Sequence, residues 1–290
     1  MRADVVAAFS TRLFERGFRK ELEKIVERMF KEIMKISENF QPATLDAVDT
    51  KTTTPIQYNV KLKSILKKWN KYLDKMSPAM VKRLQRKMLR YIDKKYNLYG
   101  LKFKIISRDL QQEMDAKTIE TLELIKSIPQ DIVKRTTPII MNSLQYGDRD
   151  TVYRELRKAK GVSRRKAKNI ARDQVAKNLE ALNTGRARQV GLEYYYWDTQ
   201  MDERVSKGKG GHKQLNGKIF KWDEPEAIID AYGNKGHPKD RVNCRCRRRW
   251  VLPRAGQKFE KIKLGYKIVN ESDGEEVEAP KDLGTSKKYQ

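Results

Sequence analysis

Apolar residues recur every three or four positions along the first half of this chain, and this period limits the fold more than any other feature. Between residues 18 and 36 the apolar stripe contains Leu22, Ile25, Val26, Met29, Phe30 and Ile33. A second stripe contains Leu62, Ile65, Leu66, Trp69, Leu73 and Met76. Side chains at this spacing share one face of an α-helix, so the sequence predicts long amphipathic helices.

The composition agrees with a helical, solvent-exposed architecture. Hydrophobic residues make up 38% of the chain and charged residues 35%, which suits long helices bathed in solvent better than a compact enzyme. At 290 residues the chain is long enough for one or two domains. No stretch approaches the roughly 18 apolar residues of a membrane span, and no signal peptide is visible, so we expect folding in a reducing cytoplasm without a membrane partner.

Proline and serine positions suggest where the helices begin and end. Pro42 and Pro55 lie in a region, residues 41–58, that reads as a linker. Ser77 followed by Pro78 predicts the start of a new helix over residues 79–96, because serine caps free amides and proline fits the first helical turn.

The same reasoning divides the next part of the chain. Pro129 separates two expected helices, 109–127 and 131–145, and Pro138 predicts a kink or a break in the second one. Ser163 is expected to cap a further long helix.

The character of the sequence changes after Gly191. Three short segments, 194–197, 218–222 and 247–252, are aromatic or β-branched and are bounded by glycine, asparagine or proline, which is typical of strands. The predicted fold class is therefore α+β, with an elongated, mostly helical N-terminal region and a small C-terminal α+β domain containing a short antiparallel sheet.

Three regions follow from these patterns. Residues 1–150 form the helical N-terminal region and residues 151–253 form the small α+β domain. Residues 254–290 read as an extended or disordered charged tail.

The formal net charge of +26 favours a polyanionic partner, because lysine and arginine that neutralise phosphates release condensed counterions. Residues 151–190 alone contain 12 Lys or Arg against 3 acidic residues. The candidate nucleic-acid contacts are Arg164, Arg165, Lys166, Lys168, Arg172, Arg245, Arg247, Arg248 and Arg249. Two alternatives stay open, an ordinary solvated helix face and a general nucleic-acid-binding module of a host.

Both histidines and both cysteines of the chain fall in one short stretch. Cys244 and Cys246 are two residues apart, so on an extended segment both thiols leave the same face and can bind one metal. His212 and His237 could complete a tetrahedral Cys2His2 shell of the kind that holds a structural Zn2+. The alternative is that all four residues are ordinary packed or hydrogen-bonded side chains.

The same cluster could also serve catalysis. A metal with an open position could activate water for phosphodiester cleavage, which would make the protein a metal-dependent nuclease. The sequence shows no carboxylate cluster of the two-metal type and no phosphate-binding glycine loop, so we assign no catalytic residues and expect no enzyme.

The residues around the cluster form a longer pattern. It runs from Trp197 through Asp202 and Arg204 to His212, then through Leu215-Asn216-Gly217 and Phe220 to His237-Pro238 and Asn243-Cys244-Arg245-Cys246. This pattern resembles the phage Mu F-like minor head proteins of the phage head morphogenesis family. The resemblance covers about residues 160–253 and carries over Trp197, Asp202, Arg204, Gly217 and Pro238 beside the four Cys and His residues.

The resemblance implies a structural role in a tailed phage. Members of the family are minor capsid proteins associated with the portal and the inside of the head. We therefore expect a virion protein of the head interior, assembled in the host cytoplasm, that contacts the portal or major capsid protein and binds double-stranded DNA without sequence preference. The interval between Arg204 and His212 holds a Gly/Lys insertion that departs from the family pattern.

Overall fold

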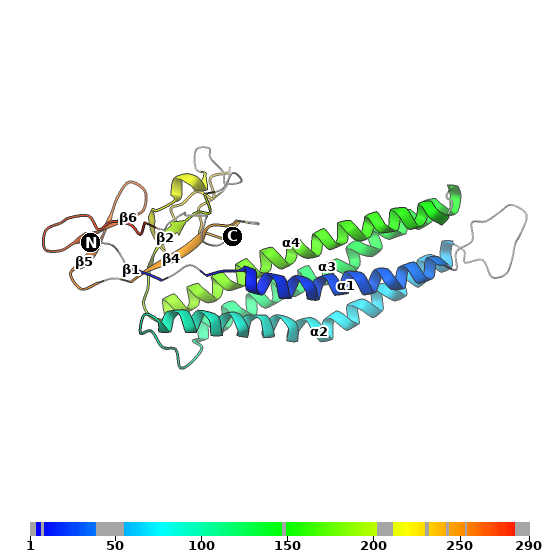
Figure 1. The fold of residues 1–290 in the computed structure, drawn as a ribbon, viewed down its shortest axis with the longest axis horizontal. Coiled ribbons are helices and arrows are strands. Elements are labelled where there is room, and N and C mark those ends of the chain that lie inside the picture. Colours follow the sequence, from blue (N-terminus) through cyan, green and yellow to red (C-terminus); the bar gives the residue numbers. More distant parts are fainter. Residues whose placement is uncertain are drawn as a thin grey trace, which may run out of the picture. The chain divides into compact units, whose positions relative to one another are not determined.

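The computed structural model describes residues 4–6, 9–38, 55–146, 149–201, 211–229, 232–241, 244–252 and 254–281. Four long helices make up most of the first two thirds of the chain (Figure 1): α1 Arg12–Glu38, α2 Pro55–Asn97, α3 Arg108–Tyr146 and α4 Arg149–Gln189. A small sheet and a 3₁₀ helix, η1 His212–Leu215, follow. The predicted α+β class is confirmed.

The sheet is antiparallel throughout and draws on both ends of the chain. Its strands are β1 Asp4–Val5, β2 Tyr194–Asp198, β3 Ile219–Lys221, β4 Arg247–Leu252, β5 Gln257–Lys261 and β6 Tyr266–Asn270. Their order in the sheet is β1-β4-β2-β3-β6-β5. The central pair is β2 and β4, with Tyr195 opposite Trp250 and Asp198 opposite Arg247. The three strands expected from the sequence correspond to β2, β3 and β4.

The chain divides into two compact units that do not follow the boundary expected at residue 150. The bundle unit comprises residues 12–84 and 118–174, and the sheet unit comprises residues 1–11, 85–117 and 175–290. Helices α2, α3 and α4 each contribute residues to both units. The apolar period shows that a helix continues, but it does not show which partner the helix packs against.

The core of the bundle unit is almost entirely hydrophobic. Its fully or nearly fully buried side chains include Leu22, Val26, Met29, Phe30, Ile33, Leu62, Leu73, Val81, Ile125, Ile128, Ile132 and Leu156. The first five of these belong to the stripe expected in residues 18–36, and its remaining residue, Ile25, is buried as well. Amphipathic helices bury such a stripe because removing apolar surface from water is favourable.

The sheet unit packs aromatic side chains on both faces of the sheet. On one face Tyr196, Ile219, Val251, Ile268 and Val277 form a buried cluster. The intervening residues Tyr195, Trp197, Phe220 and Trp250 are also buried. Successive side chains of a strand alternate between faces, so both faces of β2 and β4 are covered.

The helix breaks expected at prolines are wrong. Pro78 lies inside α2, and Pro129 and Pro138 lie inside α3, and both helices continue past them. Proline removes one backbone hydrogen bond and crowds the preceding turn, at a cost of about 3 kcal/mol. Ile125 and Ile132 are fully buried on either side of Pro129, so packing of the flanking turns offsets this cost.

The two serines interpreted as helix caps are interior residues. Ser77 and Ser163 are both buried, the first within α2 and the second within α4. Helix α4 begins at Arg149, well before the expected cap.

The expected tail is also wrong for the part that the structure describes. Residues 254–281 include β5 and β6, which form a hairpin, and β6 joins the sheet by pairing with β3. Phe259 and Tyr266 stack around Tyr194, with ring centroids 3.8 Å and 5.1 Å from it. Residues 282–290 lie outside the described residues.

Among the described helices, none has an apolar stretch long enough to span a lipid bilayer.

Candidate metal centre

The pairing of β2 with β4 creates the site. Asp198, the last residue of β2, is opposite Arg247, the first residue of β4, and the two side chains form an ion pair of 3.1 Å. Antiparallel register then places Thr199 beside Cys246, and Thr199 Oγ1 lies 3.7 Å from Cys246 Sγ. The residues just beyond these two strand ends therefore share one corner of the sheet.

Helix η1 brings a histidine to this corner. Thr199 Oγ1 donates a hydrogen bond to the His212 carbonyl at 2.9 Å, and the Thr199 amide donates to Asn216 Oδ1 at 2.8 Å. Gly217 follows with a positive φ of 79°, which a side chain would disfavour, and its amide donates to the Trp197 carbonyl. Trp197 packs edge-on against the His212 ring, with centroids 5.3 Å apart.

His212, Cys244 and Cys246 converge on one point. Their ligand atoms all lie within 4.8 Å of one another. His212 Nδ1 is 3.4 Å from Cys246 Sγ and 3.7 Å from Cys244 Sγ. Zn–S bonds near 2.3 Å and Zn–N bonds near 2.0 Å in a tetrahedron put ligand atoms about 3.5–3.8 Å apart. The two nitrogen–sulfur distances therefore fit those of a zinc tetrahedron.

The other ring nitrogen of His212, Nε2, forms a hydrogen bond with the backbone. His212 Nε2 lies 3.1 Å from the Ile229 carbonyl oxygen, and because a carbonyl only accepts, Nε2 is the donor. In a neutral imidazole this leaves the lone pair on Nδ1, which faces the two sulfur atoms. Metal-ligating histidines are oriented in this way by a second hydrogen bond to a carbonyl or carboxylate.

The surroundings favour negative charge on one sulfur. The pKa of Cys244 is lowered, first by a hydrogen bond from Cys246 and further by His212 and by the positive charge of Lys239. The pKa of Cys246 is raised because its thiol donates that hydrogen bond and because it is buried. The pKa of His212 is raised, chiefly by its hydrogen bond with Cys244. A metal binds thiolates, so a site that stabilises a thiolate is suited to one.

His237, the fourth ligand expected from the sequence, lies elsewhere in the core. Its Nδ1 is 2.7 Å from the Tyr195 hydroxyl, and its ring stacks on Trp222 with centroids 4.2 Å apart. Burial and the nearby charge of Arg248 lower the pKa of His237 to about 3, so the ring is neutral. The expectation that His237 ligates the metal is not supported, because its ring is engaged in hydrogen bonding and stacking.

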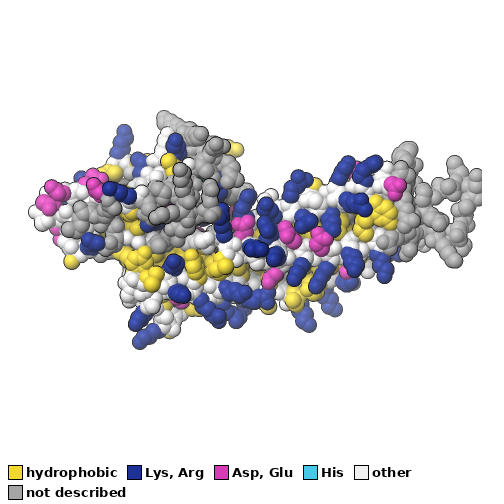
Figure 2. Space-filling model, in the orientation of Figure 1, with side chains coloured by type: hydrophobic (Ala, Val, Ile, Leu, Met, Phe, Trp, Pro, Cys, Tyr) yellow, Lys and Arg dark blue, Asp and Glu magenta, His cyan; other side chains and the backbone are white. Residues whose placement is uncertain are grey.

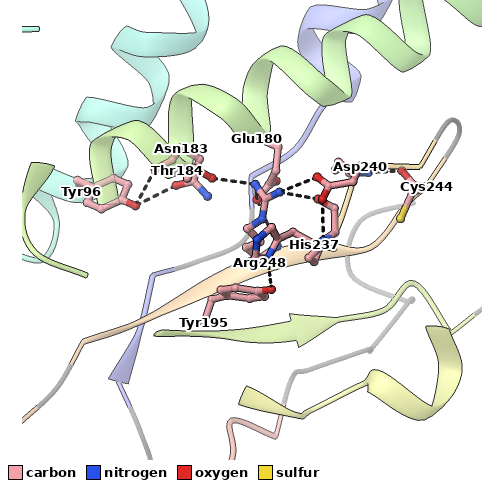
Figure 3. A network of polar contacts seen from close by, with 11 residues as sticks. Tyr96, Glu180, Asn183, Thr184, Tyr195, His237, Asp240, Cys244 and Arg248 are labelled. Carbon is pink, nitrogen blue, oxygen red and sulfur yellow. Dashed lines mark hydrogen bonds and ion pairs between the residues drawn. The ribbon is translucent and has the colours of Figure 1, made fainter. Parts of the chain in front are cut away.

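A buried ionic network lies next to this histidine (Figure 3). The Arg248 guanidinium is 3.6 Å from Glu180 and 3.4 Å from Asp240, and it donates to the Thr184 hydroxyl and the Pro238 carbonyl at 2.8 Å each. Asp240 also accepts a hydrogen bond from the His237 amide at 2.7 Å. The network therefore holds residues 237–240 beside β4.

Lys239 connects this network to the metal centre. Its Nζ donates to the Cys244 carbonyl at 2.8 Å, and Cys244, Glu180 and Cys246 are the charged or ionisable groups that favour its protonated form. Burial nevertheless lowers the pKa of Lys239. The sequence does not point to Lys239 or Glu180 as site residues, because nothing in their spacing marks them.

Three of the five family-motif residues have clear structural roles. Trp197 packs on His212, Gly217 forms the turn after η1, and Pro238 is buried and accepts the Arg248 hydrogen bond. Asp202 and Arg204, together with the Gly/Lys insertion, fall outside the described residues.

Comparison with known families agrees with this arrangement. Residues 135–249 match the model of a family described as phage Mu protein F like protein. This segment belongs to the phage Mu F-like family. The Mu F-like segment includes His212, Cys244, Cys246 and most of the ionic network, and it ends within β4.

One curated relative extends the comparison. A protein of Haemophilus influenzae, itself described as uncharacterized, is 29% identical over 141 residues, which is 48% of this chain. The match spans 30% of that relative's length. No solved structure matches this chain.

The donor set of the Mu F-like centre does not favour the nuclease that the sequence left open. Two thiolates and one imidazole suit Zn2+, whereas the cations of two-metal nucleases prefer carboxylate oxygens. Among the described residues, the group that can hold a metal contains no carboxylate. The donor set therefore differs from that of a two-metal phosphodiesterase.

The expected nucleic-acid contacts of the Mu F-like segment fall into two groups. On β4, Arg248 and Arg249 are buried, and Arg247 pairs with Asp198, so this strand does not present them to a phosphate backbone. The expectation for Arg248 and Arg249 is therefore wrong, because the central strand of a covered sheet points them inward. Arg245, just before β4, is only partly exposed.

On α4 the expected contacts lie closer to solvent. Arg164, Arg165 and Lys168 are exposed, and Arg172 is partly exposed. Two of the α4 residues are engaged by acids: Arg164 is 3.5 Å from Glu27, and Lys166 is 3.5 Å from Asp131.

Proposed function

We propose that this protein is a minor head protein of a tailed phage. It acts as a non-catalytic component of head assembly at the portal or inner capsid, in a virion assembled in the host cytoplasm. The observation that carries the proposal is that the Mu F-like segment contains the three converging side chains His212, Cys244 and Cys246. A family match and a group of side chains that could hold a metal thus coincide in the same segment.

In this proposal the three side chains hold a structural Zn2+. The support is the 3.4 Å and 3.7 Å sulfur–nitrogen distances, together with the Ile229 carbonyl that orients His212. A bound ion would join η1 to the start of β4, two segments more than 30 residues apart in the chain. Such a link should stabilise the small sheet substantially, because a small core buries little apolar surface.

The partners proposed are the portal or major capsid protein and double-stranded DNA bound without sequence preference. The support is the net charge of +26, which favours polyanions and acidic protein surfaces.

The head role is tested on purified virions of a phage that carries this gene. The chain is quantified by mass spectrometry against the major capsid protein, in both virions and proheads. We expect a few copies per particle. Absence from both particles would overturn the proposed role.

The metal is tested on the full-length chain by elemental analysis and by substitution with Co2+. Wild-type protein should bind about one zinc per chain, and its Co2+ form should show the absorption bands of thiolate coordination. Cys246→Ser and His212→Gln should lose the metal. His237→Gln is the matched control, since it removes the other histidine of the chain and should keep full zinc content. Wild-type protein without zinc, or loss of zinc in the control, would refute the three-ligand site.

A further inference from the structure

Positive charge is unevenly distributed among the four helices. Helix α2 contains 13 Lys or Arg and 2 Asp, whereas α1 contains 8 basic and 6 acidic residues and α3 contains 5 and 6. Helix α4 contains 13 basic and 4 acidic residues. Figure 2 shows Lys and Arg side chains crowded along the edge of the bundle that α2 forms in Figure 1. The excess charge is thus concentrated on particular helices.

The two acidic residues of α2 do not neutralise it. Asp74 pairs with Lys126 of α3 at 2.6 Å, and Asp93 pairs with Arg186 of α4 at 2.8 Å. The basic side chains of α2 that pair with α1 are Lys68, with Glu32, and Arg83, with Glu21. Most of the positive charge of α2 therefore has no acidic partner among the described residues.

Four lysines form a continuous row on the solvent face of this helix. Lys63, Lys67, Lys71 and Lys75 follow one another at intervals of four residues, and all four are exposed. In the part of the chain that the structure describes, none of them forms an ion pair. We call these four residues the α2 lysine row.

The row is unfavourable for the isolated protein. Residues four apart are neighbours on a helix surface, so like charges at this spacing repel one another and destabilise the helix. Alternating acids would remove the repulsion, and α1 uses such acids freely, for example Glu23 beside Arg19. A helix that keeps the repulsion is suited to a partner that supplies negative charge.

The spacing and chemistry of the row fit duplex DNA. Four helical residues rise about 6 Å, while one DNA strand carries a phosphate about every 3.4 Å along its axis, so successive lysines can meet roughly every second phosphate. Lysine is a flexible point charge that does not read bases as arginine does, so the expected binding is independent of sequence. An acidic protein surface offers no comparable regular repeat.

We propose that the α2 lysine row is the surface through which this protein binds double-stranded DNA. The inference deepens the DNA contact of the proposed function by assigning it to α2, in place of the α4 and β4 residues that the sequence suggested. On α4, Arg164 and Lys166 are already engaged by Glu27 and Asp131.

The test compares two full-length variants with the same change in net charge. One replaces the α2 lysine row, with Lys63, Lys67, Lys71 and Lys75 all changed to Gln. The other changes Arg157, Arg164, Arg165 and Lys168 of α4, all exposed, to Gln. Affinity for a random-sequence 30-base-pair duplex is measured by fluorescence anisotropy at several salt concentrations, after circular dichroism and melting confirm that both variants fold.

The α2 variant should lose about 3–4 from the slope of log affinity against log salt, since each neutralised phosphate contributes about 0.9. Its affinity at 0.1 M salt should fall by at least about tenfold. The α4 variant should change the slope by less than about 1. Equal losses in the two variants, or an unchanged slope in the α2 variant, would overturn the proposal.

Two further outcomes separate this inference from the proposed function. If the α2 variant binds DNA normally but is missing from phage heads, the row binds an acidic protein and the DNA assignment is wrong. If the wild-type chain binds DNA through α2 but is absent from virions, the DNA surface stands and the head role fails.

Discussion

The bundle unit and the sheet unit differ in the kinds of side chain that they bury. The bundle core is mainly aliphatic and aromatic, and the polar residues that it buries, such as Thr121 and Gln174 with a hydrogen bond of 2.8 Å, are uncharged among the described residues. The sheet unit buries charged side chains: Arg248 with Glu180, Arg247 with Asp198, and Arg186, whose partner Asp93 is partly exposed.

This difference shows in which unit stability depends on individual residues. Hydrophobic cores tolerate changes that conserve volume and pattern. A buried charge, by contrast, becomes strongly unfavourable once its partner is removed. Single substitutions of buried charged residues should therefore destabilise the sheet unit more than volume-conserving substitutions destabilise the bundle unit.

Removing the metal should have the largest effect and should be confined to the sheet unit. Treatment with a strong chelator, or Cys246→Ser, is expected to cost up to about 10 kcal/mol of apparent stability there, because metal binding energy contributes directly to folding. Hydrogen exchange measured by mass spectrometry should show faster exchange in β2 and β4, with unchanged protection of α1. Equal loss of protection in both units would contradict the comparison.

Breaking the buried ion pair should come next. Arg248→Met leaves Glu180 buried without its partner and should destabilise the protein by about 3–5 kcal/mol in urea unfolding. Adding Glu180→Leu to the same chain should recover a large part of this loss, because the carboxylate left without Arg248 is then removed. A double variant less stable than the single one would show that Glu180 has another essential contact.

Acid should destabilise the sheet unit through His237. Its pKa is about 3 in the folded protein against the ordinary 6.5, so below pH 6.5 the unfolded chain binds the proton more readily. Stability should therefore fall as the pH decreases from 6.5 toward 3, by as much as about 4 kcal/mol from this group. The charged groups nearby are Arg248, which opposes protonation, and Asp240.

The measurement is a series of urea melts between pH 7 and pH 4. The His237→Gln variant should be less stable at pH 7 but should lose less stability on acidification than the wild-type protein. Parallel curves for the two proteins would exclude His237 as the source of the acid sensitivity.

The smallest expected difference in stability is between two conservative substitutions, one in each unit. Tyr195→Phe removes only a hydroxyl, yet it leaves His237 Nδ1 without its partner at 2.7 Å and should cost about 1–3 kcal/mol. Leu62→Met in the bundle core conserves volume and should cost less than about 1.5 kcal/mol. Thermal melts of both variants give the comparison, and a larger loss in the bundle variant would reverse it.

The sequence predicted the helices and the central strands because their patterns are local. Apolar periodicity marked α1 and α2, and aromatic runs marked β2, β3 and β4. The edge strands β1 and β5 have no such local pattern. Strand β1 has only two residues, Asp4 and Val5, and β5 reads Gln-Lys-Phe-Glu-Lys, which resembles a solvated charged segment.

The candidate site was predicted in part. His212, Cys244 and Cys246 were correctly grouped, because their residue types are rare and their segments are close in sequence. His237 was grouped with them on the same grounds, but its partner is Tyr195, which precedes it by 42 residues. Such a pairing depends on how β2 lies under the loop at 237–240, and no local pattern encodes it.

The place of β1 in the sheet affects the order in which the elements can fold during synthesis. Val5 pairs with Val251, so a ribosome must add almost the whole of the described chain before the first strand meets its partner. At about 5–20 residues per second this wait lasts roughly 10–50 seconds. The amphipathic helices emerge during that interval, and the N-terminal segment has to stay unpaired until β4 arrives.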